Sequence, residues 1–235
     1  MFYRVNTIYP AYMGEVNCMG IGHPCTFVRL SGCNLRCYFK TKGGYCDTPE
    51  ALSMKEGKAI STNEIALKTA MYGNDLVCLT GGEPLMQDCT ELLEKLTKMN
   101  MHVAIETNGS MAISPYRHIQ GISFIMDWKA PSTGEIEKML ESNLKYLDED
   151  DFVKFVIDDD KDFDAMVKFY RRTPTRQFNI AVGLFWGSKL TYTELMKKIS
   201  AENINVYLNC QEHKMCMLYD KYKDSLSDVV IPREL

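Results

Sequence analysis

Three closely spaced cysteines are the residues of this chain best suited to chemistry. Cys33 and Cys37 follow the apolar run 27–30 within Gly-Cys-Asn-Leu-Arg-Cys, and eight residues separate Cys37 from Cys46. Three thiolates on one loop can bind three irons of a [4Fe–4S] cluster and leave the fourth iron open to another ligand. The spacing therefore predicts an iron–sulfur site with Cys33, Cys37 and Cys46 as its metal ligands.

Zinc and a disulfide are the alternatives for these cysteines. A zinc site with three cysteines usually recruits a fourth protein ligand from a second pair, and the only nearby histidine is His23. Disulfide frameworks are typical of small secreted chains, whereas residues 1–17 lack the apolar segment of a signal peptide. A zinc-stapled binding module remains the non-enzymatic alternative.

Composition narrows the class of protein. The chain has 235 residues, a net charge of −4, 46% hydrophobic residues and nine cysteines. This length suits one domain, the charge argues against nucleic acid as a partner, and no run is long enough to span a membrane. We expect a single cytoplasmic domain over residues 1–235, because so many cysteines fit a reducing compartment.

Apolar runs that read as strands alternate with patterns that read as helices. The expected strands are 25–30, 76–79, 102–106, 122–127, 152–157, 179–182 and 205–208, and the expected helices are 61–72, 88–99, 161–171 and 191–199. This alternation predicts an α/β fold with a parallel sheet. Since the chain is short for eight units, a partial barrel with six strands, (β/α)6, fits best.

Unusual residues cluster where these strands end. Thr80-Gly-Gly-Glu-Pro84 follows one strand, Glu106-Thr-Asn-Gly109 the next, and Asp127-Trp-Lys129 the one after. The chemistry of barrel-like sheets lies at the carboxyl ends of the strands, so we expect these segments at one mouth. The two glycines allow close backbone approach to a ligand, and Glu83 can receive an amino group.

Together these motifs resemble the radical S-adenosylmethionine (SAM) enzymes, and among them the 7-carboxy-7-deazaguanine synthase family. The Cys46-Asp47-Thr48 segment matches the end of that family's cluster motif, and the resemblance runs from Tyr9 to Lys214. The usual spacing, C-x3-C-x2-C, would place the third cysteine at Lys40. Members of the family tolerate insertions at this point, so the resemblance assigns the third ligand to Cys46.

The resemblance implies a partial barrel of the radical SAM type, with the cluster loop at 32–48 and a substrate-side extension at about 205–235. It implies a [4Fe–4S] cluster, SAM and Mg²⁺ as cofactors, with Thr48 as a magnesium ligand. The SAM-binding residues that it implies are Tyr45, Asp47, Gly81, Gly82, Glu83, Glu106, Asn108, Asp127 and Lys129.

The family is a carbon–nitrogen lyase of queuosine-type deazapurine biosynthesis. It converts 6-carboxy-5,6,7,8-tetrahydropterin to 7-carboxy-7-deazaguanine by hydrogen-atom abstraction, ring contraction and loss of ammonia. The resemblance also implies an electron donor such as flavodoxin and a homodimer. The substrate-binding residues that it implies are Tyr12, Met13, Gly14, Glu15, Arg29, Thr80 and His213.

Two sequence features bear on the expected substrate-binding residues. The N-terminal turn departs from the family's Gln-Gly-Glu-Gly, because Met13 and Val16 replace the glutamine and the second glycine. A charge in a buried strand is costly unless it is paired, so Arg29 facing an anionic substrate is physically reasonable.

A glycyl-radical enzyme activating protein is the alternative enzyme. Such proteins share the Gly-Cys-Asn-Leu-x-Cys and Thr-Gly-Gly-Glu-Pro-Leu segments and act on a protein partner. The Asp47-Thr48 pair, the Lys129-Ala-Pro-Ser-Thr-Gly134 segment and His213-Lys214 favour the synthase family instead.

Overall fold

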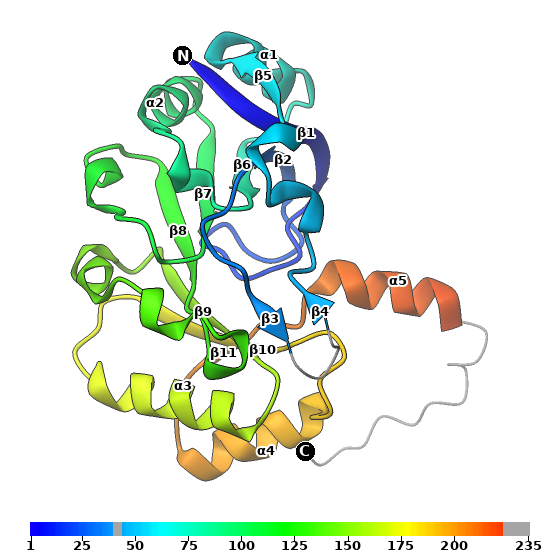
Figure 1. Ribbon diagram of the computed structural model, residues 1–235, viewed down its shortest axis with the longest axis vertical. Helices are drawn as coiled ribbons and strands as arrows, with labels where there is room; N and C mark the ends of the chain where they lie inside the picture. Colours follow the sequence, from blue (N-terminus) through cyan, green and yellow to red (C-terminus); the bar gives the residue numbers. More distant parts are fainter. Residues whose placement is uncertain (40–43, 223–235) are drawn as a thin grey trace.

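A nine-stranded sheet forms the body of the molecule. The computed structural model describes residues 1–39 and 44–222, and its main sheet has the order β11-β10-β9-β8-β7-β6-β2-β1-β5 (Figure 1). The parallel strands are β2 (Pro24–Leu30), β6 (Leu76–Gly81), β7 (His102–Thr107), β8 (Ile122–Asp127), β9 (Phe152–Ile157), β10 (Asn179–Leu184) and β11 (Tyr207–Leu208). The predicted α/β fold with a parallel, barrel-like sheet is therefore confirmed.

The antiparallel edge of the sheet is absent from the sequence-based prediction. β1 (Phe2–Tyr12) pairs antiparallel with β2, and β5 (Lys58–Ser61) pairs antiparallel with β1. A separate hairpin of β3 (Tyr38–Phe39) and β4 (Gly44–Tyr45) flanks the insertion in the cluster loop. Lys40 within that insertion, and residues 223–235 of the expected C-terminal extension, lie outside the described residues.

Four of the six crossovers between parallel strands contain an α-helix. These helices are α1 (Thr62–Met71), α2 (Thr90–Lys98), α3 (Asp160–Arg172) and α4 (Tyr192–Glu202), while α5 (Glu212–Tyr222) follows β11 and projects from the body (Figure 1). The crossovers after β7 and β8 contain short 3-10 turns, at Ser114–Tyr116, Pro131–Thr133, Ile136–Lys138 and Glu141–Tyr146. The alternation of strand and α-helix is therefore incomplete in the middle of the sheet.

Polar side chains fix where the helices begin. The Ser61 side chain accepts a hydrogen bond from the Glu64 amide and caps α1, as its sequence predicts. Asp88, expected inside a helix, instead lies just before α2 and accepts a hydrogen bond from the Thr90 amide at 3.0 Å. Short acidic side chains compete for backbone amides, which explains why that helix begins two residues later than expected.

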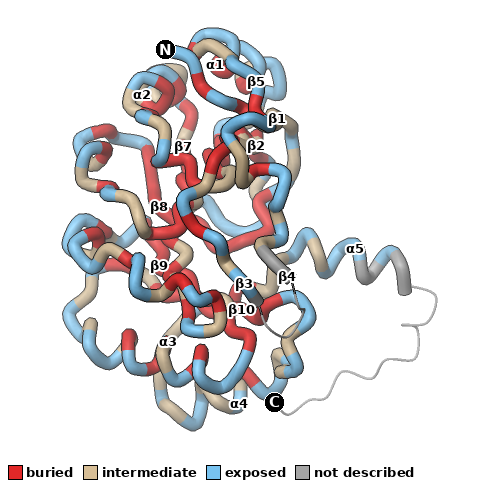
Figure 2. Tube along the Cα trace, viewed as in Figure 1, coloured by how far each residue is buried: buried red, intermediate tan, exposed pale blue. Residues whose placement is uncertain are grey.

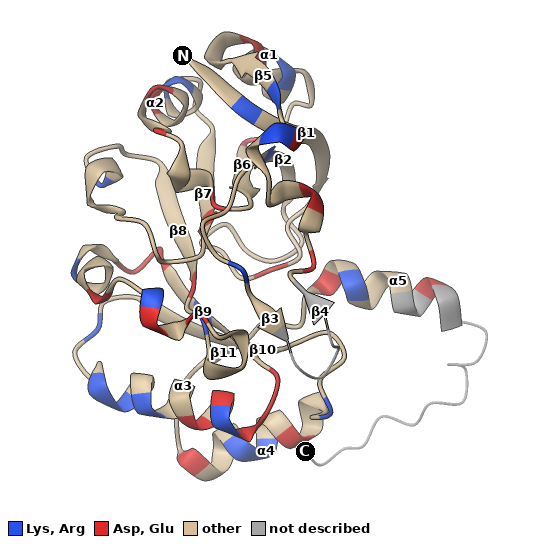
Figure 3. Cartoon of the chain, in the orientation of Figure 1, with Lys and Arg blue, Asp and Glu red and all other residues tan. Residues whose placement is uncertain are grey.

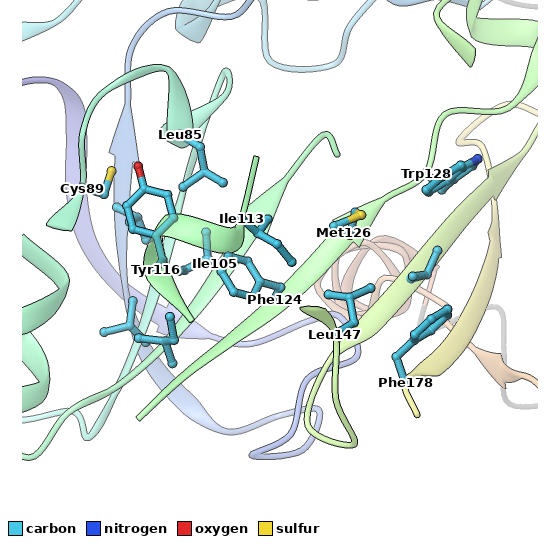
Figure 4. Close-up of a cluster of buried hydrophobic side chains, with 14 of the residues drawn as sticks. Leu85, Cys89, Ile105, Ile113, Tyr116, Phe124, Met126, Trp128, Leu147 and Phe178 are labelled. Carbon is cyan, nitrogen blue, oxygen red and sulfur yellow. The ribbon is translucent and has the colours of Figure 1, made fainter. Parts of the chain in front are cut away.

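The two faces of the sheet bury different side chains because residues alternate along each strand. One face packs against the helices: Val77, Ile105 and Phe124 belong to the same apolar cluster as Leu92 of α2 and Phe163 of α3. Figure 4 shows part of this cluster, and Figure 2 shows the strands as its buried centre. The helices thus cover one face and leave the other free to form a site.

The opposite, concave face combines small apolar residues with charged ones. Cys78 is fully buried there, as its apolar context predicts. The register places Arg29 of β2 opposite Thr80 of β6, and Asp127 of β8 opposite Lys154 of β9. The sheet therefore gathers charged groups of opposite sign near the carboxyl ends of its strands.

Charge is distributed differently on the outer helices. Lysines and arginines are interspersed with acidic residues along α3 and α4 (Figure 3). Within the two described ranges, no helix has the length and apolar character needed to cross a membrane.

The end of β6 passes so close to β2 that only glycine fits. Gly81 has a φ of +144°, and a Cβ there would lie 2.0 Å from the Leu30 carbonyl oxygen. We expect Gly81→Ala to lower the free energy of unfolding by about 2–4 kcal/mol, because backbone cannot move aside easily. Urea unfolding measures this loss.

Gly73→Ala is the matched control. Gly73 also has a positive φ, +72°, but open space surrounds its missing Cβ. Its replacement should cost only about 1–2 kcal/mol. Equal losses at the two positions would show that the close approach to Leu30 is unimportant.

Candidate active site at the carboxyl ends of the strands

A cavity of about 500 Å³ lies at the carboxyl ends of the parallel strands. Most of the expected site residues line it: Tyr12, Met13, Gly14, Glu15, Arg29, Cys37, Cys46, Asp47, Thr48, Thr80, Gly81, Gly82, Glu106, Asn108, Asp127, Lys129 and His213. Cys33 and Glu83 are not part of this lining, and the side chain of Tyr45 lies outside what the structure describes. The strand ends thus meet at one mouth.

Cys37 and Cys46 line one side of the cavity, and Cys33 lies close enough to raise the pKa of both. Burial raises the pKa of the Cys37 thiol to about 11; the ammonium of Lys129 opposes this shift, while Cys46 and Cys33 add to it. The Leu35 amide donates a hydrogen bond to Cys33 Sγ at 3.5 Å, and the Thr48 amide donates one to Cys46 Sγ at 3.4 Å. Amide hydrogen bonds to sulfur are typical of the thiolates that hold iron–sulfur clusters.

This arrangement suits a cluster better than the alternatives. All nine cysteines are free, so the disulfide alternative is wrong. The described ranges contain no three His, Cys, Asp or Glu side chains placed around a single metal ion. A cubane binds each thiolate through a different iron, and its ligands are therefore spread more widely than those of one ion.

A chain of opposite charges crosses the floor of the cavity. Lys154 forms an ion pair with Glu15 and lies 3.9 Å from Asp127, whose other partner is Lys129 at 3.0 Å. Burial opposes ionisation of Glu15, but the ammonium of Lys154 outweighs it and lowers the pKa of Glu15 to about 2. Burial likewise opposes the charge on Lys129, and Asp127 outweighs it and raises the pKa of that lysine.

The pKa of Glu106 shifts in the opposite direction from that of Glu15. Burial, together with the nearby Glu15 charge, raises the pKa of Glu106, although the Thr80 hydroxyl donates a hydrogen bond to its carboxylate at 2.8 Å. Two carboxylates of the same cavity thus differ in their affinity for a proton.

Glu83 joins two loops beside the cavity, and its expected role in binding SAM stays a prediction. Its side chain is fully buried and accepts hydrogen bonds from the Leu85 amide, the Thr107 hydroxyl and the Asn108 amide. These bonds connect the loop after β6 to the loop after β7. Gly81 and Gly82, in contrast, line the cavity with backbone.

The start of α5 closes the cavity against the N-terminal turn. Gln211 donates a hydrogen bond to Glu15 at 2.7 Å, and the Glu212 amide donates one to the Gly14 carbonyl at 2.8 Å. A Cβ at Gly14 would lie 2.4 Å from Nδ1 of His213, so glycine is required at this contact. The turn after β1 and the segment that begins α5 therefore meet at the site.

Several wall residues escaped the sequence analysis. Tyr9 and Phe27 stack with ring centroids 5.3 Å apart, and Tyr9 accepts a hydrogen bond from Arg29 at 3.4 Å. Phe185, Trp186 and Lys154 also line the wall, as do Gln211 and Lys214 from the motif that contains His213. A signal existed for Lys154, since it is the only charged residue in the apolar strand Phe-Val-Lys-Phe-Val-Ile; Trp186, on a loop, offered none.

Two solved structures share the fold of this chain. The Escherichia coli QueE crystal structure superimposes with a TM-score of 0.69 at 20% identity, covering 88% of this chain and 93% of that one. Streptococcus suis SuiB bound to S-adenosylmethionine gives a TM-score of 0.54 at 14% identity, covering 86% and 49%. Both likenesses concern the fold, which this chain shares with the two structures over most of its length.

Sequence relatives identify the family. 7-Carboxy-7-deazaguanine synthase of Methanospirillum hungatei is 34% identical over 90% of this chain and 84% of its own length. The synthase of Thermoplasma acidophilum is 33% identical over 90% and 95%. These relatives show a radical SAM enzyme by class. The chain belongs to the 7-carboxy-7-deazaguanine synthase family. No general family model matches it.

The buried position of Glu83 gives a pH dependence of stability. Burial raises its pKa to about 7 in the folded chain, against an ordinary value of 4.5. The folded state therefore holds a proton that the unfolded state releases between these values, and its contribution to stability declines as pH rises from about 4.5 to 7, by roughly 3 kcal/mol. The free energy of unfolding, measured across this range, should show the decline.

Glu83→Gln is the comparison. Glutamine cannot titrate. The unaltered chain should therefore lose free energy of unfolding relative to this variant as pH rises. A difference that stays constant from pH 4.5 to 7 would mean that Glu83 is ionised throughout.

Proposed function

We propose that this chain converts 6-carboxy-5,6,7,8-tetrahydropterin to 7-carboxy-7-deazaguanine. Membership of the synthase family, together with a small-molecule-sized cavity at the cysteine loop, is the observation that carries the proposal. A [4Fe–4S] cluster and SAM bound at this site would supply the radical chemistry needed to take a hydrogen atom from C6 of the pterin. Ring contraction and loss of ammonia then give the product.

The chain's own residues bind and orient both molecules. Cys33, Cys37 and Cys46 would hold the cluster, and Gly81, Gly82, Asn108 and Lys129 would hold SAM. Arg29 lines the cavity next to the stacked rings of Tyr9 and Phe27, which suits a flat heterocycle carrying a carboxylate.

The remaining proposals concern the metal ion, the electron donor and the assembly of the protein. Thr48 lines the cavity beside Asp47, so its hydroxyl is available to a Mg²⁺ that also binds substrate oxygens and water. A flavodoxin-like electron donor, a homodimer, a cytoplasmic location and a single domain over residues 1–235 complete the proposal.

The single most informative experiment is anaerobic turnover. The reconstituted protein should convert carboxytetrahydropterin with SAM and a reductant, and faster with Mg²⁺ than after chelation. Cleavage of SAM without any pterin product would instead favour the glycyl-radical activating alternative, in which the substrate is a protein.

The assignment of Cys46 can be tested by cluster content. Cys33→Ala, Cys37→Ala and Cys46→Ala should each abolish the iron–sulfur absorbance and SAM cleavage, because a cluster with two protein ligands is not retained. Cys78→Ala, a buried thiol on the concave face, should keep both. A full cluster in Cys46→Ala would assign the third ligand to another cysteine.

Arg29 should determine pterin affinity. Loss of a charge-assisted hydrogen bond in a dry pocket costs about 2–5 kcal/mol when its partner stays unpaired. Arg29→Ala should therefore weaken pterin binding at least tenfold and leave SAM affinity nearly unchanged. Anaerobic calorimetry measures both affinities.

Arg176→Ala is the control, because Arg176 lies outside the cavity lining and packs on Tyr170 instead. Pterin affinity that is the same in Arg29→Ala as in the control would remove Arg29 from the substrate site.

A further inference from the structure

Lys154 is a buried cation that the proposed reaction does not yet use. It lies in the middle of β9, is 6% exposed, and points to the cavity from the concave face of the sheet. An aliphatic residue would fill such a position at lower cost, because a buried ammonium must be compensated by partners. Its ion pair with Glu15 and its 3.9 Å approach to Asp127 supply that compensation.

The three carboxylates near Lys154 are not equivalent. Asp127 has its own cation, Lys129, at 3.0 Å. Glu106 accepts a hydrogen bond from Thr80, and burial favours its protonated form. Glu15 is the carboxylate that depends on Lys154 for its charge, since its remaining partner, Gln211, is neutral.

Glu15 also has capacity for a ligand. Gln211 donates to Oε1 and Lys154 to Oε2, and each carboxylate oxygen offers two lone-pair sites. One site therefore remains on each oxygen. A pterin presents two adjacent donors, its 2-amino group and the neighbouring ring N–H, and this pair matches a carboxylate that is ionised and held in one orientation.

We propose that Lys154 is a positioning residue, which fixes the Glu15 carboxylate in its charged form as the acceptor for the donor edge of the pterin. This inference rests on the proposed function and adds the residue that keeps the Glu15 carboxylate ionised and oriented. Lys154 need not touch the substrate; it acts through Glu15.

The groups around Glu15 determine what its removal would do. Lys154 faces it from β9, Glu106 from β7, and Gln211 and His213 from the segment that begins α5. Without Lys154, Gln211 and His213 still favour the charged carboxylate, while burial and Glu106 favour the proton. The pKa of Glu15 would then rise, because burial of the carboxylate would be less compensated.

The experiment measures pterin affinity by anaerobic calorimetry on the full chain with its cluster and SAM but no reductant, from pH 6 to 8. Lys154→Met should raise the pterin Kd at least tenfold, and the Kd should rise several-fold further as pH falls to 6, because Glu15 becomes protonated. Lys154→Arg should restore most of the affinity. SAM affinity should stay within about twofold, since Asp127 keeps Lys129.

A double variant separates positioning from other roles. In the Glu15→Gln background, Lys154→Met should cause no further loss of pterin affinity and no extra pH dependence, because the residue through which it acts is absent. This comparison holds even if Lys154→Met alone fails to fold, since the double variant removes both charges. Lys95→Met, on the exposed face of α2, is the control for loss of a lysine.

Three results would overturn the inference. They are additive losses in the double variant, pterin binding by Lys154→Met equal to that of the unaltered protein, and an equal fall in pterin and SAM affinity, which a purely structural role would give. Absence of pterin binding by the unaltered protein would overturn the proposed function as well, so the two failures are distinguishable.

Discussion

Compensation of buried charge on the concave face is the constraint on which the site depends. A lysine in the centre of a parallel sheet is tolerated only if carboxylates reach it, and Lys154 obtains one from a turn 139 residues away. That partner, Glu15, is held in place by Gln211, so the same charge also fixes the start of α5. One ion pair thus joins the N-terminal turn, the middle of the sheet and the last helix.

The parts of the fold that sequence predicts well are those with local signals. The central strands are continuous apolar runs that end in glycine or polar residues, and Ser61 and Glu64 mark the start of α1. β1 gave no such signal, because only Tyr3 and Val5 of its eleven residues are buried. The helices missing after β7 and β8 could not be inferred either, since a parallel crossover does not require an α-helix.

The site was predictable to the extent that its residues belong to motifs. Cysteine spacing, Gly81-Gly82 and the strand-end positions of Glu106 and Asp127 identified most of the wall. Glu83 shows the limit: its motif is recognisable, but whether the carboxylate faces a ligand or three backbone and side-chain donors depends on the neighbouring loop. Pairings across the whole chain, such as Glu15 with Lys154, leave no local trace.

The bond between Gln211 and Glu15, which are 196 positions apart, has a consequence for how the protein is made. At 5–20 residues per second, a ribosome completes Gln211 roughly 10–40 s after Glu15. During this interval the cysteine loop has been synthesised while the segment that closes the cavity has not. Closure of the pocket by Gln211 therefore comes late in synthesis, after the cysteine loop has been made.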